Sequence, residues 1–356
     1  MNVLIMAGGT GGHVMPALAV AHALVSQGHA VRWLGTDKGL EARAVPAAGI
    51  ELFTLPVAGL RGKGVLRYLS APVGLLRALW QAISLLRRLR PDVVLGLGGY
   101  AAGPGGLAAF ALRRPLVIHE QNARPGLTNR LLAWLARRVL CGFAGTHLAG
   151  RAAEFTGNPV RAELLNLAPP RERLAAAPRL LVLGGSQGAQ AINSAVPAAL
   201  DRLREGGAAL PKVRHQAGRA HADAVAADYR ARGIEATVDG FIDDMATAYR
   251  DADLAICRAG ALTVAELCAV GLGAILAPYP HAADDHQTAN ARQMASAGAA
   301  MLLPQAELTP QRLADALRPL LADPTRRLAM AEAARGLARP DAAARVAAVC
   351  LEAAHA

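Results

Sequence analysis

The chain has 356 residues, enough for two domains of ordinary size, and 53% of them are hydrophobic while 18% are charged. This balance is typical of a soluble globular protein and excludes an intrinsically disordered chain. Lys and Arg number 38 against 27 Asp and Glu, so the formal net charge of +11 favours an anionic partner such as a phosphorylated substrate or a phospholipid surface. A genome that is rich in Arg and Ala is the plain alternative. Nucleic acid is the least favoured partner, because no basic run is interleaved with aromatic residues.

The four cysteines lie far apart and form no C-x-x-C pair, so neither a zinc site nor a redox pair is expected. This usage suits a reducing cytoplasm. The N-terminus leads directly into an apolar run, without the basic segment and cleavage site of a signal peptide. No uncharged apolar stretch reaches roughly 18 residues, so the sequence predicts no transmembrane helix.

The first half of the chain begins with a strand, a glycine turn and a helix. Residues 3–6 form a short apolar run, glycines follow at 8–12, and 16–25 has helical composition. This order is the first unit of a βαβ fold. Later apolar runs predict three more strands and one helix: strands at 31–34, 92–96 and 116–119, and a helix over about 126–136.

The same pattern restarts in the second half. Residues 179–183 predict a strand, glycine-rich 184–189 follows, and a helix begins near Ala191. Further strands are predicted at 212–215, 235–238, 254–257 and 274–277, with helices between them and a last helix at 340–356. Continuous apolar runs are typical of strands that helices cover on both faces. The prolines between 157 and 170 predict the break between two α/β domains in series.

Three glycine-rich turns follow predicted strands, at 8–12, 98–106 and 184–189. Between a strand and a helix, backbone N–H groups and the helix N-terminus favour an anion. The spacing is not G-x-G-x-x-G, and no Walker Lys-Ser/Thr follows, so dinucleotide dehydrogenases and P-loop enzymes are disfavoured. One such turn is nearly as well explained by a tight turn alone. Three of them at the carboxyl ends of strands favour ligand loops around a cleft.

Longer blocks carry a family resemblance. They are Met6–His13 with Pro16, Gly96–Gly106, His119–Asn122, Gly157–Arg161, Gly184–Ala189, Phe241–Met245, and Cys257–Glu266 through His281 to Gln287. In this order they resemble the MurG family, the bacterial N-acetylglucosaminyltransferases of glycosyltransferase family 28, over nearly the whole chain. The resemblance implies an α/β fold of the GT-B type, in which two Rossmann-like domains with parallel sheets face a central cleft.

The resemblance also implies the parts that the domains play. Residues 1–160 would form the N-terminal domain that takes the acceptor and faces the membrane. Residues 161–339 would bind UDP-N-acetylglucosamine, and the helix at 340–356 would pack back on the N-terminal domain. The implied reaction is the inverting transfer of N-acetylglucosamine to undecaprenyl-pyrophosphoryl-MurNAc-pentapeptide (lipid I). Its product is the β-1,4-linked lipid II of peptidoglycan biosynthesis.

The implied setting is peripheral, at the cytoplasmic face of the inner membrane. Expected partners are UDP-N-acetylglucosamine, lipid I, anionic inner-leaflet phospholipids, and cell-wall synthesis and division proteins. No cofactor and no metal are expected, because Asp243 and Asp244 belong to a matched block without a metal role in the family. Helix dipoles and backbone amides would offset the charge that develops on the leaving UDP.

Several residues are assigned to the donor by this resemblance. Ser186 would hold the diphosphate, although a helix N-cap is the plain alternative. Glu266 would accept hydrogen bonds from the ribose, although a Glu at the start of a helix also complements its dipole. Gln287 would bind the transferred sugar. The uracil would meet Arg161, whose alternative is a surface charge, and the backbone of Ile242, which otherwise reads as a core residue. The remaining donor residues are the turn Ala261, Leu262 and Thr263 with its neighbours Val264 and Ala265.

His13 and Glu266 are the candidate catalytic residues. An acceptor hydroxyl attacks poorly unless it loses its proton, and a His can take that proton near neutral pH. We therefore expect His13 to be the general base or to position it, although a lone His is more often structural. Thr10, Gly11, Gly12 and Asn122 would contact donor or acceptor from the first domain. The acceptor side would also include Gly98, Gly99 and Tyr100.

The segment 61–90 alternates apolar residues with seven Lys and Arg, which predicts a helix that is apolar on one side and basic on the other. Such a helix can rest on anionic lipid, but the residues alone slightly favour a crossover helix packed on the sheet. The lipid-linked acceptor that the resemblance implies favours the membrane. Two other functions also remain open at this point. They are a UDP-N-acetylglucosamine 2-epimerase, which uses a similar two-domain fold, and a non-catalytic scaffold that binds a nucleotide sugar or lipid.

Overall fold

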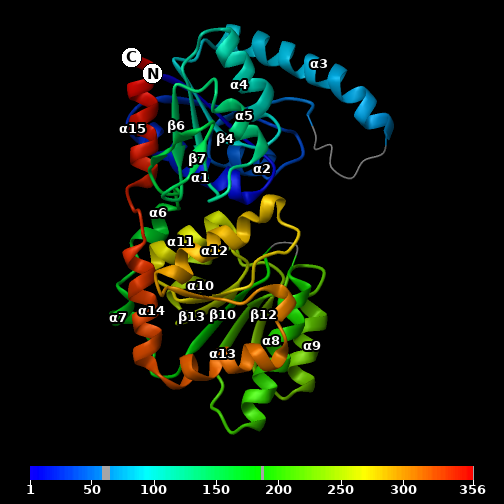
Figure 1. The fold of residues 1–356 in the computed structure, drawn as a ribbon, viewed down its shortest axis with the longest axis vertical. Helices are drawn as coiled ribbons and strands as arrows, with labels where there is room; N and C mark the ends of the chain where they lie inside the picture. Colours follow the sequence, from blue (N-terminus) through cyan, green and yellow to red (C-terminus); the bar gives the residue numbers. More distant parts are fainter. Residues whose placement is uncertain (58–64, 186–187, 356) are drawn as a thin grey trace. The chain divides into compact units, whose positions relative to one another are not determined.

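The computed structural model describes residues 1–57, 65–185 and 188–355 (Figure 1). The chain divides into two compact units. Unit 1 comprises Met1–Arg161 and Arg339–Ala356, and unit 2 comprises Ala162–Ala338. Each unit has its own sheet and its own hydrophobic core.

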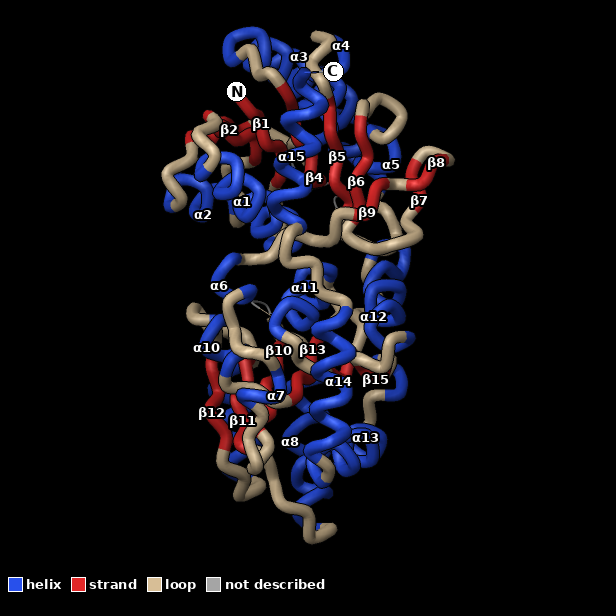
Figure 2. The backbone as a smooth tube through the Cα atoms, turned by 90° about the vertical axis from the view of Figure 1, so that its left-hand side faces the viewer, coloured by secondary structure: helices blue, strands red, loops and turns tan. Residues whose placement is uncertain are grey.

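In its described residues, unit 1 holds a parallel sheet in the order β3-β2-β1-β4-β5-β6-β9. Its strands are β1 Asn2–Ala7, β2 Ala30–Gly35, β3 Glu51–Thr54, β4 Val93–Gly98, β5 Leu116–Glu120, β6 Arg138–Cys141 and β9 Glu154–Phe155, with the antiparallel pair β7 His147–Leu148 and β8 Arg151–Ala152 beside them. Its helices are α1 Gly11–Ser26, α2 Glu41–Ala47, α3 Val65–Leu89, α4 Ala102–Ala111, α5 Leu127–Leu132 and α15 Ala342–His355. Helices lie on both faces of the sheet (Figure 2).

Strand β1 shows why an apolar run becomes a central strand. Its alternate residues Val3 and Ile5 pack in a core with α1 and α15. Leu4 and Met6 point the other way, into a core with α3 and α4. Because side chains alternate across a strand, a strand that is covered on both faces must be apolar throughout.

The C-terminal helix α15 belongs to unit 1. Its residues Val346, Val349 and Cys350 are buried in the same core as Val14 and Leu24 of α1. Figure 1 shows α15 beside β6. The C-terminal helix therefore packs on the N-terminal part of the chain.

Unit 2 holds a parallel sheet in the order β12-β11-β10-β13-β14-β15 within its described residues. The strands are β10 Arg179–Leu183, β11 Lys212–Gln216, β12 Ala236–Asp239, β13 Leu254–Cys257, β14 Ala274–Leu276 and β15 Ala300–Leu302. The helices are α6 Ala162–Leu165, α7 Pro170–Arg173, α8 Gln190–Glu205, α9 Ala222–Ala231, α10 Met245–Arg250, α11 Ala261–Val270, α12 His286–Ser296, α13 Pro310–Ala322 and α14 Pro324–Gly336, with 3-10 turns at Ala283–Asp285 and Gln305–Glu307.

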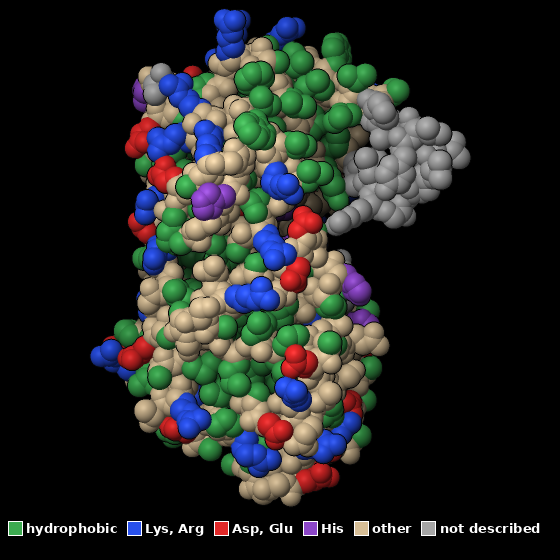
Figure 3. All heavy atoms as spheres, in the orientation of Figure 1, with side chains coloured by type: hydrophobic (Ala, Val, Ile, Leu, Met, Phe, Trp, Pro, Cys, Tyr) green, Lys and Arg blue, Asp and Glu red, His purple; other side chains and the backbone are tan. Residues whose placement is uncertain are grey.

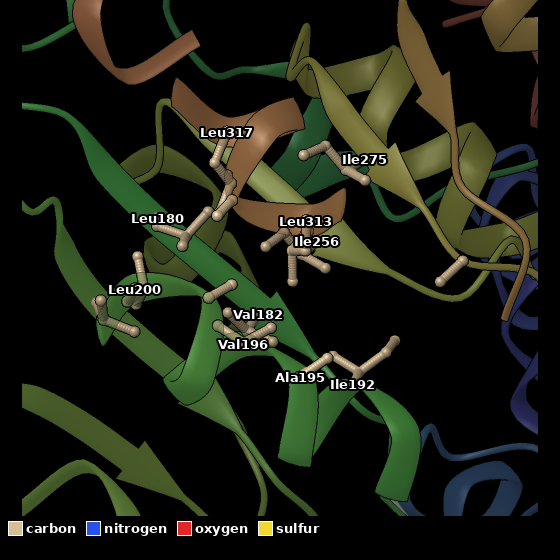
Figure 4. Packing of buried hydrophobic residues seen from close by; sticks show 14 of the residues in the cluster. Leu180, Val182, Ile192, Ala195, Val196, Leu200, Ile256, Ile275, Leu313 and Leu317 are labelled. Atoms are coloured by element: carbon tan, nitrogen blue, oxygen red, sulfur yellow. The ribbon is translucent and has the colours of Figure 1, made fainter. Parts of the chain in front are cut away.

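The core of unit 2 lies between its sheet and helices α8 and α13. Figure 4 shows Val182 of β10 beside Val196 of α8, with Leu313 of α13 close to Ile256 of β13 and Leu317 of α13 close to Leu180 of β10. These side chains are buried. Burial at about 25 cal/mol per Å² of apolar surface is the main force that holds β10 in place.

Each predicted strand is confirmed by the structure, but one predicted helix is too long. Instead of 126–136, α5 covers only Leu127–Leu132. The reason is the strand β6, which the sequence analysis missed. The N–H of Arg137 donates to the carbonyl of Leu116, so the chain leaves the helix in order to join the sheet.

Candidate functional site

Three loops of unit 1 meet at the carboxyl ends of its central strands. They follow β1, β4 and β5, which are neighbours in the sheet, while β2 lies on the other side of β1. Such a reversal of strand order is where open α/β sheets bind ligands. The backbones of the first two loops touch. A Cβ on Gly99, which has a φ of +86°, would lie 2.4 Å from the carbonyl oxygen of Gly8.

His13 lies in this cluster of loops, in the first turn of α1, and is half-buried. Its Nδ1 is 2.9 Å from Oε1 of Gln121, which follows β5. The ring also lies against Gly98, where an added Cβ would come within 3.0 Å of the His13 Cε1. The structure therefore places His13 beside Gly98.

The first turn of α1 offers a place for an anion. Thr10 is the N-cap residue with extended backbone and, in the described part of the chain, no side-chain capping hydrogen bond. The N–H groups of a helix's first turn have no partner within the helix, so those of Gly11 and Gly12 point away from it. Together with the helix dipole they favour a phosphate.

A buried carboxylate fixes this loop, and no sequence pattern pointed to it. Glu41 at the start of α2 is fully buried. Its Oε2 accepts from the N–H of Gly9 at 2.9 Å, and its Oε1 accepts from the N–H and the hydroxyl of Thr36 at 3.0 and 2.6 Å. Glycines at 8, 35 and 39 leave the space for this carboxylate, since a Cβ at any of them would come within 3 Å of the Glu41 side chain.

A second buried carboxylate fixes the loop after β5. Glu120 accepts from the N–H groups of Asn122 and Gly126 and from the side-chain amides of Asn122 and Asn129, at 2.9 to 3.2 Å. The half-buried Asn122 is thus held in one orientation by its own neighbour. Tyr100 on the adjoining loop is 55% exposed, so its ring is available to a ligand.

In unit 2 the N-terminus of α11 is the corresponding place. Gly260 is its N-cap residue, and the N–H groups of Ala261, Leu262 and Thr263 form the first turn. Arg258, just before it, donates to the carbonyls of Ala277 and Pro278. Such bonds hold the turn rigidly where a diphosphate would meet its amides.

Gln287 also holds this region together. Its Oε1 accepts from the N–H groups of Ala259 and Tyr279, at 3.3 and 2.9 Å, and so ties the loop after β13 to the loop after β14. Gln287 lies in the first turn of α12 and is half-buried. With its oxygen engaged, its amide NH₂ is the group that can serve a sugar hydroxyl.

Glu266 lies elsewhere on α11 than the sequence analysis expected. It is the sixth residue of the helix rather than a residue at its start, so the alternative role of complementing the helix dipole is wrong. Glu266 is buried, and its Oε2 accepts from the hydroxyl of Tyr249 at 3.0 Å. Val264 is buried as well, whereas Ala265 is half-buried.

The remaining residues assigned to the donor differ in burial, and one of them is not described by the structure. Ile242 is buried, as a core residue would be, in the loop before α10. In that loop Asp244 caps α10 by accepting from the N–H of Thr247, a structural task. Arg161 is half-buried at the end of the first stretch of unit 1. Ser186 lies outside the described residues.

Behind the glycine turn of unit 2 lies a buried polar chain that the sequence analysis also missed. Asn193 of α8 donates to the carbonyl of Ala217, and its Oδ1 lies 3.1 Å from Nε2 of His215, whose Nδ1 is 3.0 Å from the hydroxyl of Tyr229. Burial lowers the pKa of His215 to about 4 and leaves the ring neutral. Among the described residues no three His, Cys, Asp or Glu side chains converge as metal ligands would.

Large apolar side chains are exposed together on unit 1. This apolar patch comprises Val73, Leu75, Leu76 and Trp80 of α3, Leu107 and Phe110 of α4, Leu127 and Leu131 of α5, and Trp134. Figure 3 shows hydrophobic side chains gathered over this region. In the part of α3 whose side chains are described, several apolar residues therefore face solvent instead of packing on the sheet. Arg61 and Lys63 lie outside the described residues. No helix among the described residues is long and apolar enough to cross a membrane.

Comparison with known proteins agrees with this geometry. The glycosyltransferase family 28 N-terminal domain matches residues 3–141, and the family 28 C-terminal domain matches residues 179–346. A protein of Alkalilimnicola ehrlichii is 62% identical over 99% of both chains, and its name is UDP-N-acetylglucosamine–N-acetylmuramyl-(pentapeptide) pyrophosphoryl-undecaprenol N-acetylglucosamine transferase.

Solved structures distinguish relatives of the same family from proteins that share only the fold. The crystal structure of MurG from Acinetobacter baumannii has a TM-score of 0.85 at 40% identity and covers 99% of both chains. A UDP-N-acetylglucosamine 2-epimerase has a TM-score of 0.67 at only 14% identity, which shows a shared fold and nothing more. The two matched domains together span most of the chain, which belongs to glycosyltransferase family 28.

Proposed function

We propose that this protein transfers N-acetylglucosamine from UDP-N-acetylglucosamine to lipid I and so forms the β-1,4 linkage of lipid II in peptidoglycan synthesis. The observation that carries this function is the 62% identity, along the full length, to a protein named for that transfer. Both family 28 domains are present, and both units keep strand-end loops suited to phosphate.

The donor's place in this proposal is unit 2. The amides of Ala261, Leu262 and Thr263 stabilise the charge that develops on the β-phosphate of the leaving UDP, aided by the dipole of α11. Glu266 accepts from the ribose hydroxyls, the backbone of Ile242 reads the uracil, and the NH₂ of Gln287 donates to the sugar. Ser186 completes the diphosphate site.

The acceptor's place is unit 1, where the first turn of α1 holds the diphosphate of lipid I and Tyr100 contacts the sugar. His13 removes the proton from the 4-hydroxyl of the muramoyl residue as its oxygen attacks C1 of N-acetylglucosamine. The new C–O bond forms on the face opposite the leaving UDP. A single displacement of this kind turns the α-linked donor into a β-linked product.

Membrane attachment through the apolar patch completes the proposal. Exposed apolar side chains beside exposed Arg77, Arg113 and Arg130 suit the inner leaflet, where apolar groups enter the lipid boundary and cations meet anionic head groups. The net charge of +11 acts in the same direction. Cell-wall synthesis and division proteins at that membrane are the expected protein partners.

An assay of UDP release tests the function against its two rivals. The protein is incubated with UDP-N-acetylglucosamine, with and without a short-chain lipid I analogue, and UDP and nucleotide sugars are quantified. UDP release that depends on the analogue supports the transfer. Formation of UDP-N-acetylmannosamine without acceptor would instead support an epimerase, and binding without turnover would support a scaffold.

A further inference from the structure

A chain of hydrogen bonds runs from the backbone to His13 within unit 1. The Nε2 of His119 lies 2.9 Å from the carbonyl oxygen of Gly157, and the Nδ1 of His119 lies 3.2 Å from Nε2 of Gln121. The other end of the Gln121 amide, Oε1, lies 2.9 Å from Nδ1 of His13. His119 and Gln121 are buried, so water does not compete for these bonds.

The direction of this chain is fixed at its backbone end. A carbonyl oxygen can only accept, so Nε2 of His119 must carry a proton. Burial lowers the pKa of His119 to about 4, so the ring is neutral and its Nδ1 is an acceptor. That nitrogen requires a donor, which is the NH₂ of Gln121.

The Gln121 amide is oriented by a second bond as well. Its Nε2 also donates to the carbonyl oxygen of His119, at 3.0 Å. A flipped amide would place its oxygen against that carbonyl and against the unprotonated Nδ1, which are both acceptors. The backbone of Gln121 is fixed too, since its carbonyl accepts from the side chain of Asn158 at 2.9 Å. The Gln121 Oε1 is therefore the atom that faces His13.

We propose that Gln121 is a positioning residue that holds His13 in the tautomer with its proton on Nδ1, which leaves Nε2 as the base for the acceptor hydroxyl. An oxygen that can only accept demands a proton on the Nδ1 it faces. Gly98 leaves room for the ring, since a Cβ there would lie 3.0 Å from the His13 Cε1. This inference rests on the proposed role of His13. The amide does what a carboxylate does in a Ser-His-Asp triad, but without adding a charge.

Three variants test the proposal, and thermal melting checks that each of them is folded. Gln121→Leu removes the acceptor at similar volume, and kcat should fall about 10- to 100-fold while KM for UDP-N-acetylglucosamine stays unchanged. Gln121→Glu keeps an acceptor for Nδ1 but sets its second oxygen against the carbonyl and Nδ1 of His119, both acceptors, so it should lower the melting temperature. It should still keep a higher kcat than Gln121→Leu, and the acid limb of kcat/KM should move to higher pH because a carboxylate stabilises the imidazolium. Gln27→Leu, at an exposed Gln, is the control and should change nothing.

The tautomer itself is measured by nitrogen NMR of ¹⁵N-histidine-labelled protein, with the His13 signals identified by their loss in His13→Ala. The wild type should show Nδ1 protonated and Nε2 unprotonated in the neutral ring, and Gln121→Leu should show a mixture. An Nε2-protonated His13 in the wild type would overturn the proposal, as would full kcat in Gln121→Leu. If His13→Ala kept the wild-type rate, the proposed base would fail, whereas loss in His13→Ala alone would reject only the role of Gln121.

Discussion

At the residue scale, buried polar side chains hold the candidate site residues in place. Glu41 accepts from the N–H groups of Gly9 and Thr36, Glu120 accepts from those of Asn122 and Gly126, and Gln121 joins two histidines. A buried carboxylate is costly unless it is fully bonded, so such a residue fixes its loop strongly. Single-sequence reasoning misses Glu41 because its partner Gly9 is distant in the chain.

Substitution of Glu41 should therefore disturb the acceptor loop. In Glu41→Gln the NH₂ group must face one of the N–H donors at Gly9 or Thr36, so a buried donor loses its acceptor. We expect a loss of about 1–3 kcal/mol in the free energy of unfolding and a lower kcat. Urea unfolding and the transfer assay measure the two effects.

The matched control is Glu51→Gln. Glu51 is exposed and forms a surface ion pair with Arg32. Its substitution should change stability by less than about 1 kcal/mol. Equal effects of the two substitutions would refute the positioning role of Glu41.

His119 makes the stability of unit 1 depend on pH. Burial lowers its pKa to about 4, below the unfolded value of 6.5, so the unfolded chain binds the extra proton between these two values. Stability from this residue is thus complete above pH 6.5 and falls as the pH drops toward 4, by about 1.4 kcal/mol per pH unit. Urea unfolding followed by tryptophan fluorescence reports on it, because Trp33, Trp80 and Trp134 all lie in unit 1.

The contribution of His119 is isolated by comparison with two variants. His119→Gln cannot titrate and should lose this part of the acid sensitivity, whereas the exposed His22→Gln should keep it. The same slope in all three proteins would contradict the assignment.

Glycine loops and helix N-termini form the candidate site at the element scale. The order of strand, glycine turn and helix was enough to predict these loops, since only glycine combines positive φ with close approach of two backbones. The short strands β3, β6, β9 and β15 could not be predicted, because their pairing partners rather than their own composition make them strands. The position of Glu266 along α11 was misjudged for a similar reason, as helix ends depend on local capping.

The contact between the first two loops is tested by Gly99→Ala. Its Cβ would lie 2.4 Å from the Gly8 oxygen, so the two loops must separate and kcat should fall at least about tenfold. Gly28→Ala has a similar positive φ of +81° with nothing within 4 Å, so it carries the backbone strain without the clash. Comparable transfer rates in the two variants would show that the contact does not matter.

The apolar patch on α3, α4 and α5 is tested by vesicle sedimentation. Leu131→Ser with Trp134→Ser removes two exposed apolar groups and should weaken binding to phosphatidylglycerol vesicles at least about tenfold. Val25→Ser, at a residue that is 51% exposed on α1, should not. Unchanged binding in the double variant would place the membrane contact elsewhere.

At the scale of the whole molecule, the chain is a glycosyltransferase of family 28 that consists of two units. Both units have strands, glycine turns and helices in a similar order, and each has its own core. The fold alone does not select the reaction, because an epimerase shares it at 14% identity. The family blocks, spread from Met6 to Gln287, made the choice possible from the sequence. The hydrogen-bond chain that reaches His13 required the structure, since it joins α1 to the end of β5 and to Gly157.

The central claim is an inverting transfer to lipid I, and the structure of the product tests it most directly. The protein is incubated with UDP-N-acetylglucosamine and a short-chain lipid I analogue, and the disaccharide product is analysed by proton NMR. A β-configured N-acetylglucosamine on the 4-oxygen of the muramoyl residue is the expected result. An α-linked product, attachment at another oxygen, or the absence of a disaccharide would contradict the account.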